Sequence, residues 1–165
     1  MKSSLTFLLL TATVTAAYSQ AASGPVTRDE IRAAMAKIEG PLQRRLKVQF
    51  PKSGLAAGSQ PASRTEIVKE FMRLWKASEK VFRFTPRPYE VYPEVLAQHN
   101  KGQMITDLSY LIKRGAVAPV GPLAWGPKDT VSPQEFGDAM AMLVHQITAL
   151  SHDPSPKFTP ILQRP

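Results

Sequence analysis

The chain has 165 residues, of which 43% are hydrophobic, and a formal net charge of +8 at pH 7. This length predicts one domain, with or without extended arms, and the composition is sufficient for a modest hydrophobic core. Because the sequence has no cysteine, disulfides, thiolate nucleophiles and cysteine-ligated metals are excluded. The positive charge predicts attraction to polyanions, which include acidic glycans, phospholipid headgroups and nucleic acids.

Residues 1–19 have the pattern of a secretory signal peptide. Lys2 precedes an apolar run at Leu5–Ala17, and small residues at Ala17 and Ser19 fit a cleavage site. The alternatives are an uncleaved anchor and a buried helix, but the run is shorter than the ~20 residues that a membrane-spanning helix needs. We therefore expect cleavage and an exported protein of the periplasm, cell surface or extracellular space, with no transmembrane helix after cleavage.

Three short segments share one helix-start pattern. In each, a Ser or Thr that can cap a helix is followed three residues later by a Glu, which together form a capping box. The pairs are Thr27 with Glu30, Ser63 with Glu66, and Ser132 with Glu135. Pro133 adds a proline at the first position of the third helix, where its missing N–H is not needed. The repetition of the pattern indicates degenerate internal repeats.

The apolar spacing predicts four main helices, at residues 27–38, 63–80, 103–114 and 132–150. The sequence Glu39–Pro41 should end the first helix, because glycine favours a helix end and proline opposes continuation. Each helix has one apolar face, which we expect in the core: Ile31, Ala34, Met35 and Ile38; Ile67, Phe71, Leu74 and Trp75; Met104, Leu108, Leu111 and Ile112; Phe136, Met140, Leu143, Val144 and Ile147.

The segments between these helices are rich in proline and glycine. Alternating apolar residues at 46–50 permit a short strand. Residues 81–92 should form an extended connector across apolar surface, residues 93–100 a helical turn, and residues 116–130 a loop. The last segment, 151–165, reads as a proline-rich tail. The prediction is a mainly α fold: a small helical bundle with an extended connector and tail.

In order, these motifs resemble the S-layer homology module, a helix–loop–helix repeat of exported bacterial proteins. The segments that carry the resemblance are Val26–Glu30, Ala62–Glu66, Tyr92–Val95, Ile105–Gly115, Trp125–Pro127 and Val131–Phe136. The resemblance covers residues 63–150 best, within an expected domain at 25–150. The chain departs from the family pattern in two ways. The first repeat is only 36 residues long (63 − 27), against 69 for the next (132 − 63), and Pro133 stands where the family has arginine.

The resemblance implies a non-catalytic module that attaches non-covalently to cell-wall polysaccharide or peptidoglycan. Carried over to this chain, the motif arginines Arg28 and Arg64 are the glycan-binding candidates, with Trp125 as a weaker one. Arginine suits this role because its planar guanidinium can bind a carboxylate with two hydrogen bonds. Trp125 itself fits either a core position or a sugar-stacking platform. The departures favour an alternative, a structural or protein–protein interaction module of the envelope that has lost glycan binding.

Catalysis has little support in the sequence. Glu30, Glu66 and Glu135 are better explained as capping residues than as acid–base catalysts. The three histidines show no metal-ligand spacing, and neither a nucleophile elbow nor a phosphate-binding glycine loop is present. We therefore predict no enzyme, no catalytic residue, no metal and no cofactor. The basic run 44–47 could contact nucleic acid, but the expected export argues against that partner. A protein of the cell envelope is the second expected partner, beside the glycan.

Overall fold

The computed structural model describes residues 24–86 and 88–151, and this part of the chain is mainly helical, as predicted, and contains no strand. The expected leader and all but the first residue of the expected tail lie outside the described residues. The helices are α2 (Arg28–Leu46), α3 (Arg64–Glu79), α4 (Pro93–Leu96), α5 (Gln103–Lys113), α6 (Pro122–Trp125) and α7 (Pro133–Ser151). Among the described helices, none is both long and apolar enough to cross a membrane.

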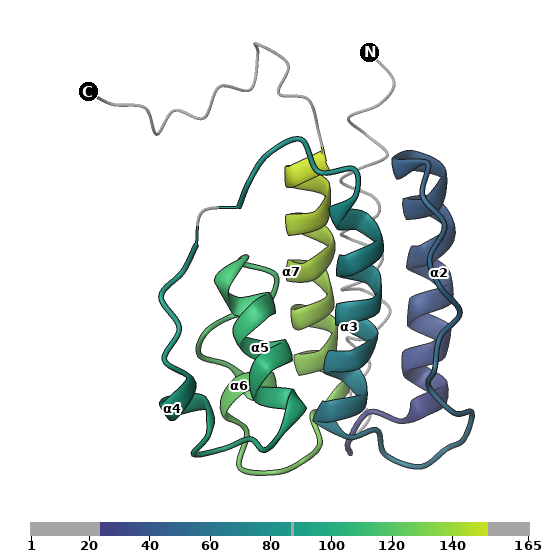
Figure 1. Ribbon diagram of the computed structural model, residues 1–165. Helices are drawn as coiled ribbons and strands as arrows, with labels where there is room; N and C mark the ends of the chain where they lie inside the picture. Colours follow the sequence, from purple (N-terminus) through teal and green to yellow (C-terminus); the bar gives the residue numbers. More distant parts are fainter. Residues whose placement is uncertain (1–23, 87, 152–165) are drawn as a thin grey trace.

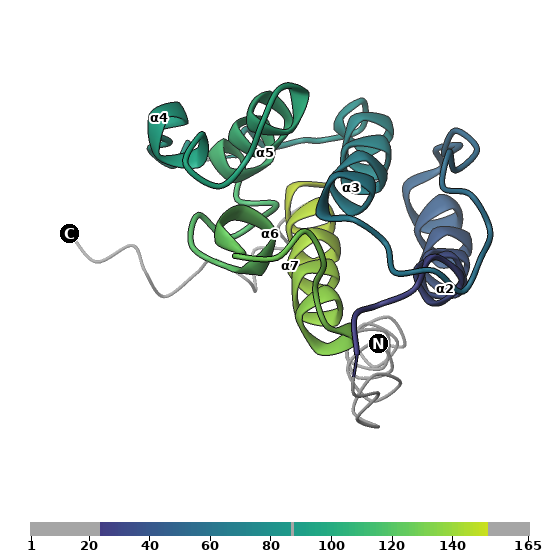
Figure 2. The ribbon, with the colours of Figure 1, turned by 90° about the horizontal axis from the view of Figure 1, so that it is seen from below.

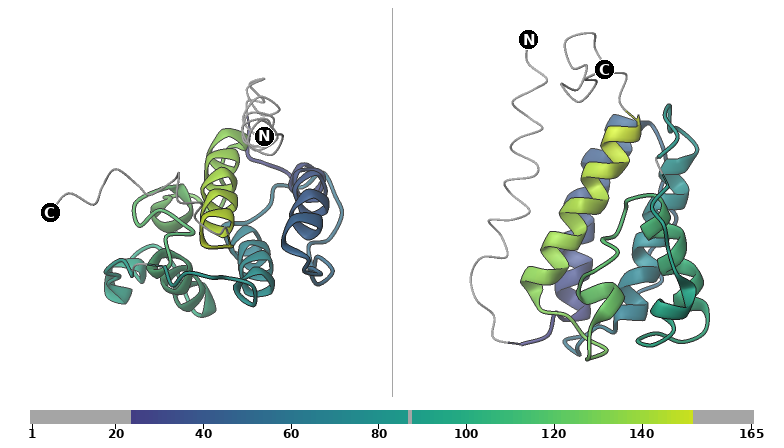
Figure 3. Two further views of the ribbon diagram at one scale, coloured as in Figure 1. Left: turned by 90° about the horizontal axis from the view of Figure 1, so that it is seen from above. Right: turned by 90° about the vertical axis from the view of Figure 1, so that its left-hand side faces the viewer.

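Helix α3 is the centre of the bundle. It packs against α5 on one side and α7 on another, and α4 packs against α5. Helix α2 forms the outer layer beyond α3 and α7, while α4 and α6 lie at the opposite side, as Figures 1 and 2 show. The connector between α3 and α4 passes the end of α7 and descends along the outside of α5 (Figures 1 and 3).

All three predicted helix starts are confirmed by reciprocal capping hydrogen bonds. The backbone N–H of Thr27, Ser63 and Ser132 donates to the Glu three residues later, at 2.8, 2.8 and 2.7 Å. In return, the backbone N–H of Glu30, Glu66 and Glu135 donates to the side-chain hydroxyl of the capping residue, at 3.3, 3.2 and 3.2 Å. Two otherwise unpaired helix donors are satisfied at each start.

The core is built from the predicted apolar faces of the four main helices. Every residue that we expected there is buried. Phe71 and Phe136, from α3 and α7, are fully buried, and their ring centroids lie 6.3 Å apart. Trp75 is also fully buried, and Phe82 of the connector packs edge-on against it at 4.9 Å. The connector therefore crosses apolar surface as expected.

The predicted end of the first helix is wrong. Helix α2 continues through Gly40 and Pro41 to Leu46, where Lys47 in the left-handed conformation (φ 55°) ends it. Proline removes one helical hydrogen bond, but continuation places Leu42 in the core at 1% exposure. It also brings Glu39 to the guanidinium of Arg73 on α3, which in addition pairs with Glu70 at 2.8 Å. These long-range contacts stabilise the continued helix by more than Gly40 and Pro41 destabilise it.

Two further local predictions need correction. Residues 46–50 form no strand: Leu46 belongs to α2, and Phe50 is buried in extended chain that lies beside α2 and α3. The segment is held there by Arg73, which donates to the carbonyl oxygen of Pro51 at 2.6 Å. The expected loop 116–130 contains the short helix α6, which has too few residues to show a periodic pattern.

Candidate functional site

The three capped helix starts meet at one end of the bundle. The residue before each cap is buried, and the backbone N–H of Val26 donates to the carbonyl oxygen of Val131 at 2.8 Å. The N–H of Ala62 donates in turn to the carbonyl oxygen of Val26 at 2.9 Å. We call this region, residues 26–30, 62–66 and 125–135, the motif end. Segments far apart in the sequence thus form one continuous backbone network here, with α2, α3 and α7 leaving it side by side (Figure 1).

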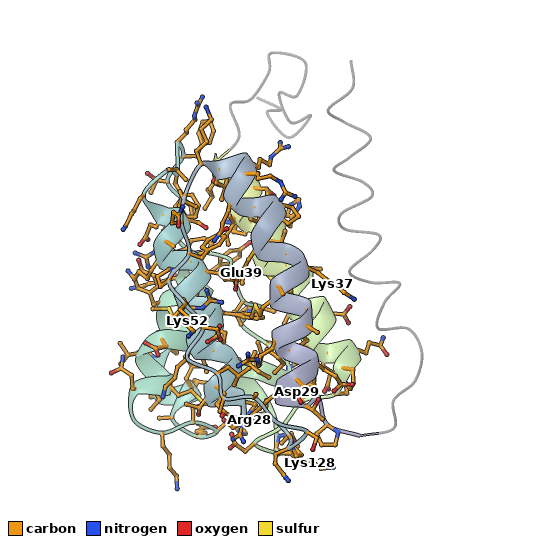
Figure 4. The ribbon with its side chains drawn as sticks, turned by 90° about the vertical axis from the view of Figure 1, so that its right-hand side faces the viewer. Arg28, Asp29, Lys37, Glu39, Lys52 and Lys128 are labelled. Atoms are coloured by element: carbon orange, nitrogen blue, oxygen red, sulfur yellow. The ribbon has the colours of Figure 1, made fainter. Side chains whose placement is uncertain are left out.

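Arg28 lies at this end with its side chain 30% exposed. Its Nε donates to Oε1 of Glu66 at 2.9 Å, which joins the first residue of α2 to the capping glutamate of α3. Figure 4 shows Arg28 and Asp29 at the same end as Lys128, whereas Lys37, Glu39 and Lys52 lie farther along the bundle. The exposed Lys128 and the partly exposed Arg28 give the motif end two accessible cations, beside the exposed carboxylates of Asp29, Asp129 and Glu135.

Arg64 does not reach the surface. It is 4% exposed, and its guanidinium donates from Nη1 to the carbonyl oxygen of Leu123 at 3.1 Å and from Nη2 to that of His99 at 2.9 Å. Burial lowers its pKa, and the negative charge of Asp129 partly offsets this effect. The guanidinium therefore joins α3 to the segments around α4 and α6. Our expectation of glycan contact through Arg64 is corrected to a structural role.

Trp125, the last residue of α6, is 40% exposed and is therefore not a core residue. Its indole stacks on the exposed imidazole of His99, with ring centroids 5.6 Å apart and an interplanar angle of 26°. Next to His99, the buried Asn100 donates from Nδ2 to the carbonyl oxygens of Leu96 and Ala124, at 2.9 and 2.8 Å. The backbone before Trp125 is thus anchored by Asn100, while its indole packs on His99 and remains 40% exposed.

Pro133 stands at the first position of α7 and is buried. The third helix start therefore presents no cation, unlike the arginines that begin α2 and α3. Sequence reasoning did not find His99 and Asn100 as parts of this site. His99 stacks on Trp125 and accepts from Arg64 through its carbonyl oxygen, and Asn100 donates to the carbonyl oxygen of Ala124. These contacts join different segments, so no local sequence pattern predicts them.

The capping glutamates are occupied by structural hydrogen bonds. Burial acts to raise the pKa of Glu66, but hydrogen bonds from Ser63 and from Arg28 outweigh it, so the pKa of this carboxyl lies below its ordinary value. A carboxylate held in this way is a stabilising anion at a helix start and not a poised general acid. Within residues 24–86 and 88–151, no cluster of three acidic or histidine side chains is placed to hold a metal ion.

No protein-family model matches the chain, and no match was found among curated proteins or solved structures. The resemblance to S-layer homology modules therefore depends on the motifs and their order in the chain.

Proposed function

We propose that this protein is an exported, non-catalytic adhesion module that binds cell-wall polysaccharide or peptidoglycan through the motif end. The observation that carries the proposal is the convergence of the three helix starts, joined through Val26, Ala62 and Val131, on a surface that presents Arg28 and Lys128. Repeats that meet in this way display loop groups from different parts of the chain on one surface. Such a surface can contact several units of a polymer at once.

Two cations of the motif end, Arg28 and Lys128, can contact acidic groups of a glycan, and the exposed carboxylates of Asp29, Asp129 and Glu135 beside them can accept hydrogen bonds from its hydroxyl groups. The terminal nitrogens of Arg28 remain to bind a carboxylate while its Nε pairs with Glu66. Trp125 supplies an aromatic face on the neighbouring segment. The overall charge of +8 favours approach of an acidic polymer.

Co-sedimentation with purified, protein-free cell-wall sacculi tests this function. We expect the wild-type protein to sediment with the sacculi and Arg28→Ala to remain largely in solution. Arg44→Ala is the matched control, because it removes the same charge from the exposed last turn of the same helix. Recovery of the wild-type protein entirely in the supernatant would exclude the function. An equal loss of sedimentation in both variants would show that only the net charge of the protein matters, and not the position of Arg28.

A second candidate is a structural or protein–protein interaction module of the envelope without glycan binding. The observation that favours it is the burial of Arg64, which leaves one motif arginine at the surface in place of two. Chemical cross-linking in the envelope fraction distinguishes the two candidates. A single stable protein partner together with no sedimentation on sacculi would support this function, whereas sedimentation that depends on Arg28 would support glycan binding.

A further inference from the structure

A second charged surface lies at the end of the bundle opposite the motif end. Helices α2, α3 and α7 run side by side from the motif end, so their last turns lie together at this opposite end (Figures 1 and 3). We call it the far end, and it comprises residues 44–47, 79–84 and 148–151. Because α2 and α7 each have 19 residues, they are about 28 Å long, and the two ends are separate surfaces.

The far end is basic. Its exposed cations are Arg44, Arg45, Lys47, Lys80 and Arg83. Its one acid is Glu79, whose carboxylate already pairs with Lys76 at 3.2 Å and with Arg114 at 3.1 Å. Within the described residues, Arg44, Lys47 and Lys80 form no ion pair. The far end therefore presents charge of one sign, whereas the motif end has exposed carboxylates beside its cations.

An aromatic side chain is displayed among these cations. Phe84 is 40% exposed, although its backbone is fixed. The carbonyl oxygen of Leu150, in the last turn of α7, accepts hydrogen bonds from the backbone N–H of Arg83 at 2.9 Å and of Phe84 at 3.3 Å. Two residues earlier, Phe82 packs on the buried Trp75. Residues 83–84 are thus attached to the end of α7, with the Phe84 ring partly in solvent.

The basic surface continues into a hollow of about 570 Å³ beside the connector. The lining of this hollow includes Lys113 and Arg114 as well as the apolar Phe84 and Pro86. Cationic and apolar groups therefore occur together here, as they do around Phe84 itself.

This combination distinguishes between the partners of a basic surface. Helix dipoles favour cations at helix C-termini, but a dipole gives no reason for an exposed phenylalanine among them. A soluble polyanion uses the charge alone. A membrane surface uses both, because anionic headgroups attract Lys and Arg while an aromatic side chain enters the boundary between headgroups and acyl chains.

We propose that the far end docks on an anionic phospholipid surface, with Arg44, Lys47 and Lys80 against the headgroups and the Phe84 side chain at the boundary with the acyl chains. The motif end then faces away from the membrane. This interaction goes beyond glycan binding and is independent of it, since an assay with lipid vesicles contains no glycan.

Co-sedimentation with lipid vesicles tests the proposal. The mature chain, from Gln20 onward, is used so that the apolar leader does not contribute. At about 0.15 M salt, we expect it to sediment with vesicles of phosphatidylcholine and phosphatidylglycerol and to remain in solution with vesicles of phosphatidylcholine alone. Recovery in the supernatant with both kinds of vesicle would overturn the proposal.

The contribution of the far-end cations is measured with a pair of double variants. Lys47→Gln/Lys80→Gln should weaken partitioning into the anionic vesicles by roughly 10- to 30-fold, since each cation near such a surface contributes about fivefold. Lys37→Gln/Lys69→Gln is the matched control, because it removes the same charge from exposed positions inside the same two helices. Equal losses in the two double variants would overturn the proposal, because only net charge would then matter.

Phe84→Ala separates a lipid surface from a soluble polyanion. It should weaken binding to the anionic vesicles several-fold and leave binding to dextran sulfate, a soluble polyanion, unchanged. Wild-type binding of Phe84→Ala to the vesicles would overturn docking on lipid, because it would assign the far end to polyanions in general.

Discussion

Arg28 and Glu66, which are 38 residues apart in the sequence, connect the starts of α2 and α3. Nε of Arg28 donates to Oε1 of Glu66 at 2.9 Å, while Oε2 of the same carboxylate accepts from the backbone N–H of Ser63 at 2.8 Å. One carboxylate therefore closes the capping box of α3 and holds the first residue of α2. The two helix starts cannot separate without breaking the Arg28–Glu66 ion pair.

Replacing Glu66 tests this link. Glu66→Gln should lower the free energy of unfolding at pH 7 by about 1–2 kcal/mol, because it weakens a cap and removes an ion pair. The folded-state pKa of Glu66 is depressed, since hydrogen bonds from Ser63 and Arg28 outweigh the effect of burial. Its contribution is therefore complete above the unfolded pKa and is lost as the pH falls through the folded pKa. Urea denaturation at pH 7 and at pH 3 measures the difference.

Glu135→Gln is the control, because Glu135 closes the same kind of box on α7. It should cost less at pH 7 than Glu66→Gln. A wild-type advantage over Glu66→Gln that is as large at pH 3 as at pH 7 would show that the charge of Glu66 does not act as described.

The buried position of Arg64 gives a second prediction. Arg64→Met keeps an unbranched side chain but leaves the carbonyl oxygens of Leu123 and His99 without their donors. We expect a loss of about 2–4 kcal/mol in the free energy of unfolding, since hydrogen bonds to a charged group are stronger than neutral ones. Thermal and urea unfolding measure it. A stability equal to that of Arg28→Ala would contradict the structural role.

Phe136 tests the core between α3 and α7. It is fully buried and contacts Phe71, so Phe136→Ala should cost about 3–5 kcal/mol. Phe84→Ala is the matched control, because Phe84 is 40% exposed. Equilibrium denaturation of both variants compares the two positions, and a loss below about 1 kcal/mol for Phe136→Ala would exclude this packing.

Two glycines should respond to alanine with opposite signs. Gly40 lies inside α2, and a Cβ there would meet only the guanidinium of Arg44 at 3.7 Å. Gly40→Ala should therefore stabilise the protein by about 0.5–1 kcal/mol. Gly115 has φ +70°, and its Cβ would lie 3.0 Å from the Tyr89 side chain. Gly115→Ala should therefore destabilise the protein by at least about 1 kcal/mol. Melting temperatures that change in the same direction in both variants would contradict the conformations described for these two glycines.

The helix starts and the core faces could be predicted from the sequence because their causes are local. A capping box needs only residues i and i+3, and the stripe of Phe136, Met140 and Leu143 follows from helical periodicity. The end of α2 could not be predicted in this way. It depends on the burial of Leu42 and on the pairing of Glu39 with Arg73, which comes from another helix.

The site was predictable in part, for the same reason. The positions of Arg28 and Arg64 at the first residue of a helix were predicted correctly. Their environments were not, because the partners of Arg64 are carbonyl oxygens 59 and 35 residues away in the sequence. The half-exposed setting of Trp125 likewise depends on His99, in a different segment.

The adhesion function is tested most directly by mapping the bound surface. Amide chemical shifts of the isotope-labelled protein should be recorded during titration with solubilised cell-wall polysaccharide. We expect saturable shifts to concentrate in the motif end, residues 26–30, 62–66 and 125–135, and to be lost in Arg28→Ala. Shifts confined to the far ends of α2 and α7, or no shift at saturating polysaccharide, would contradict it.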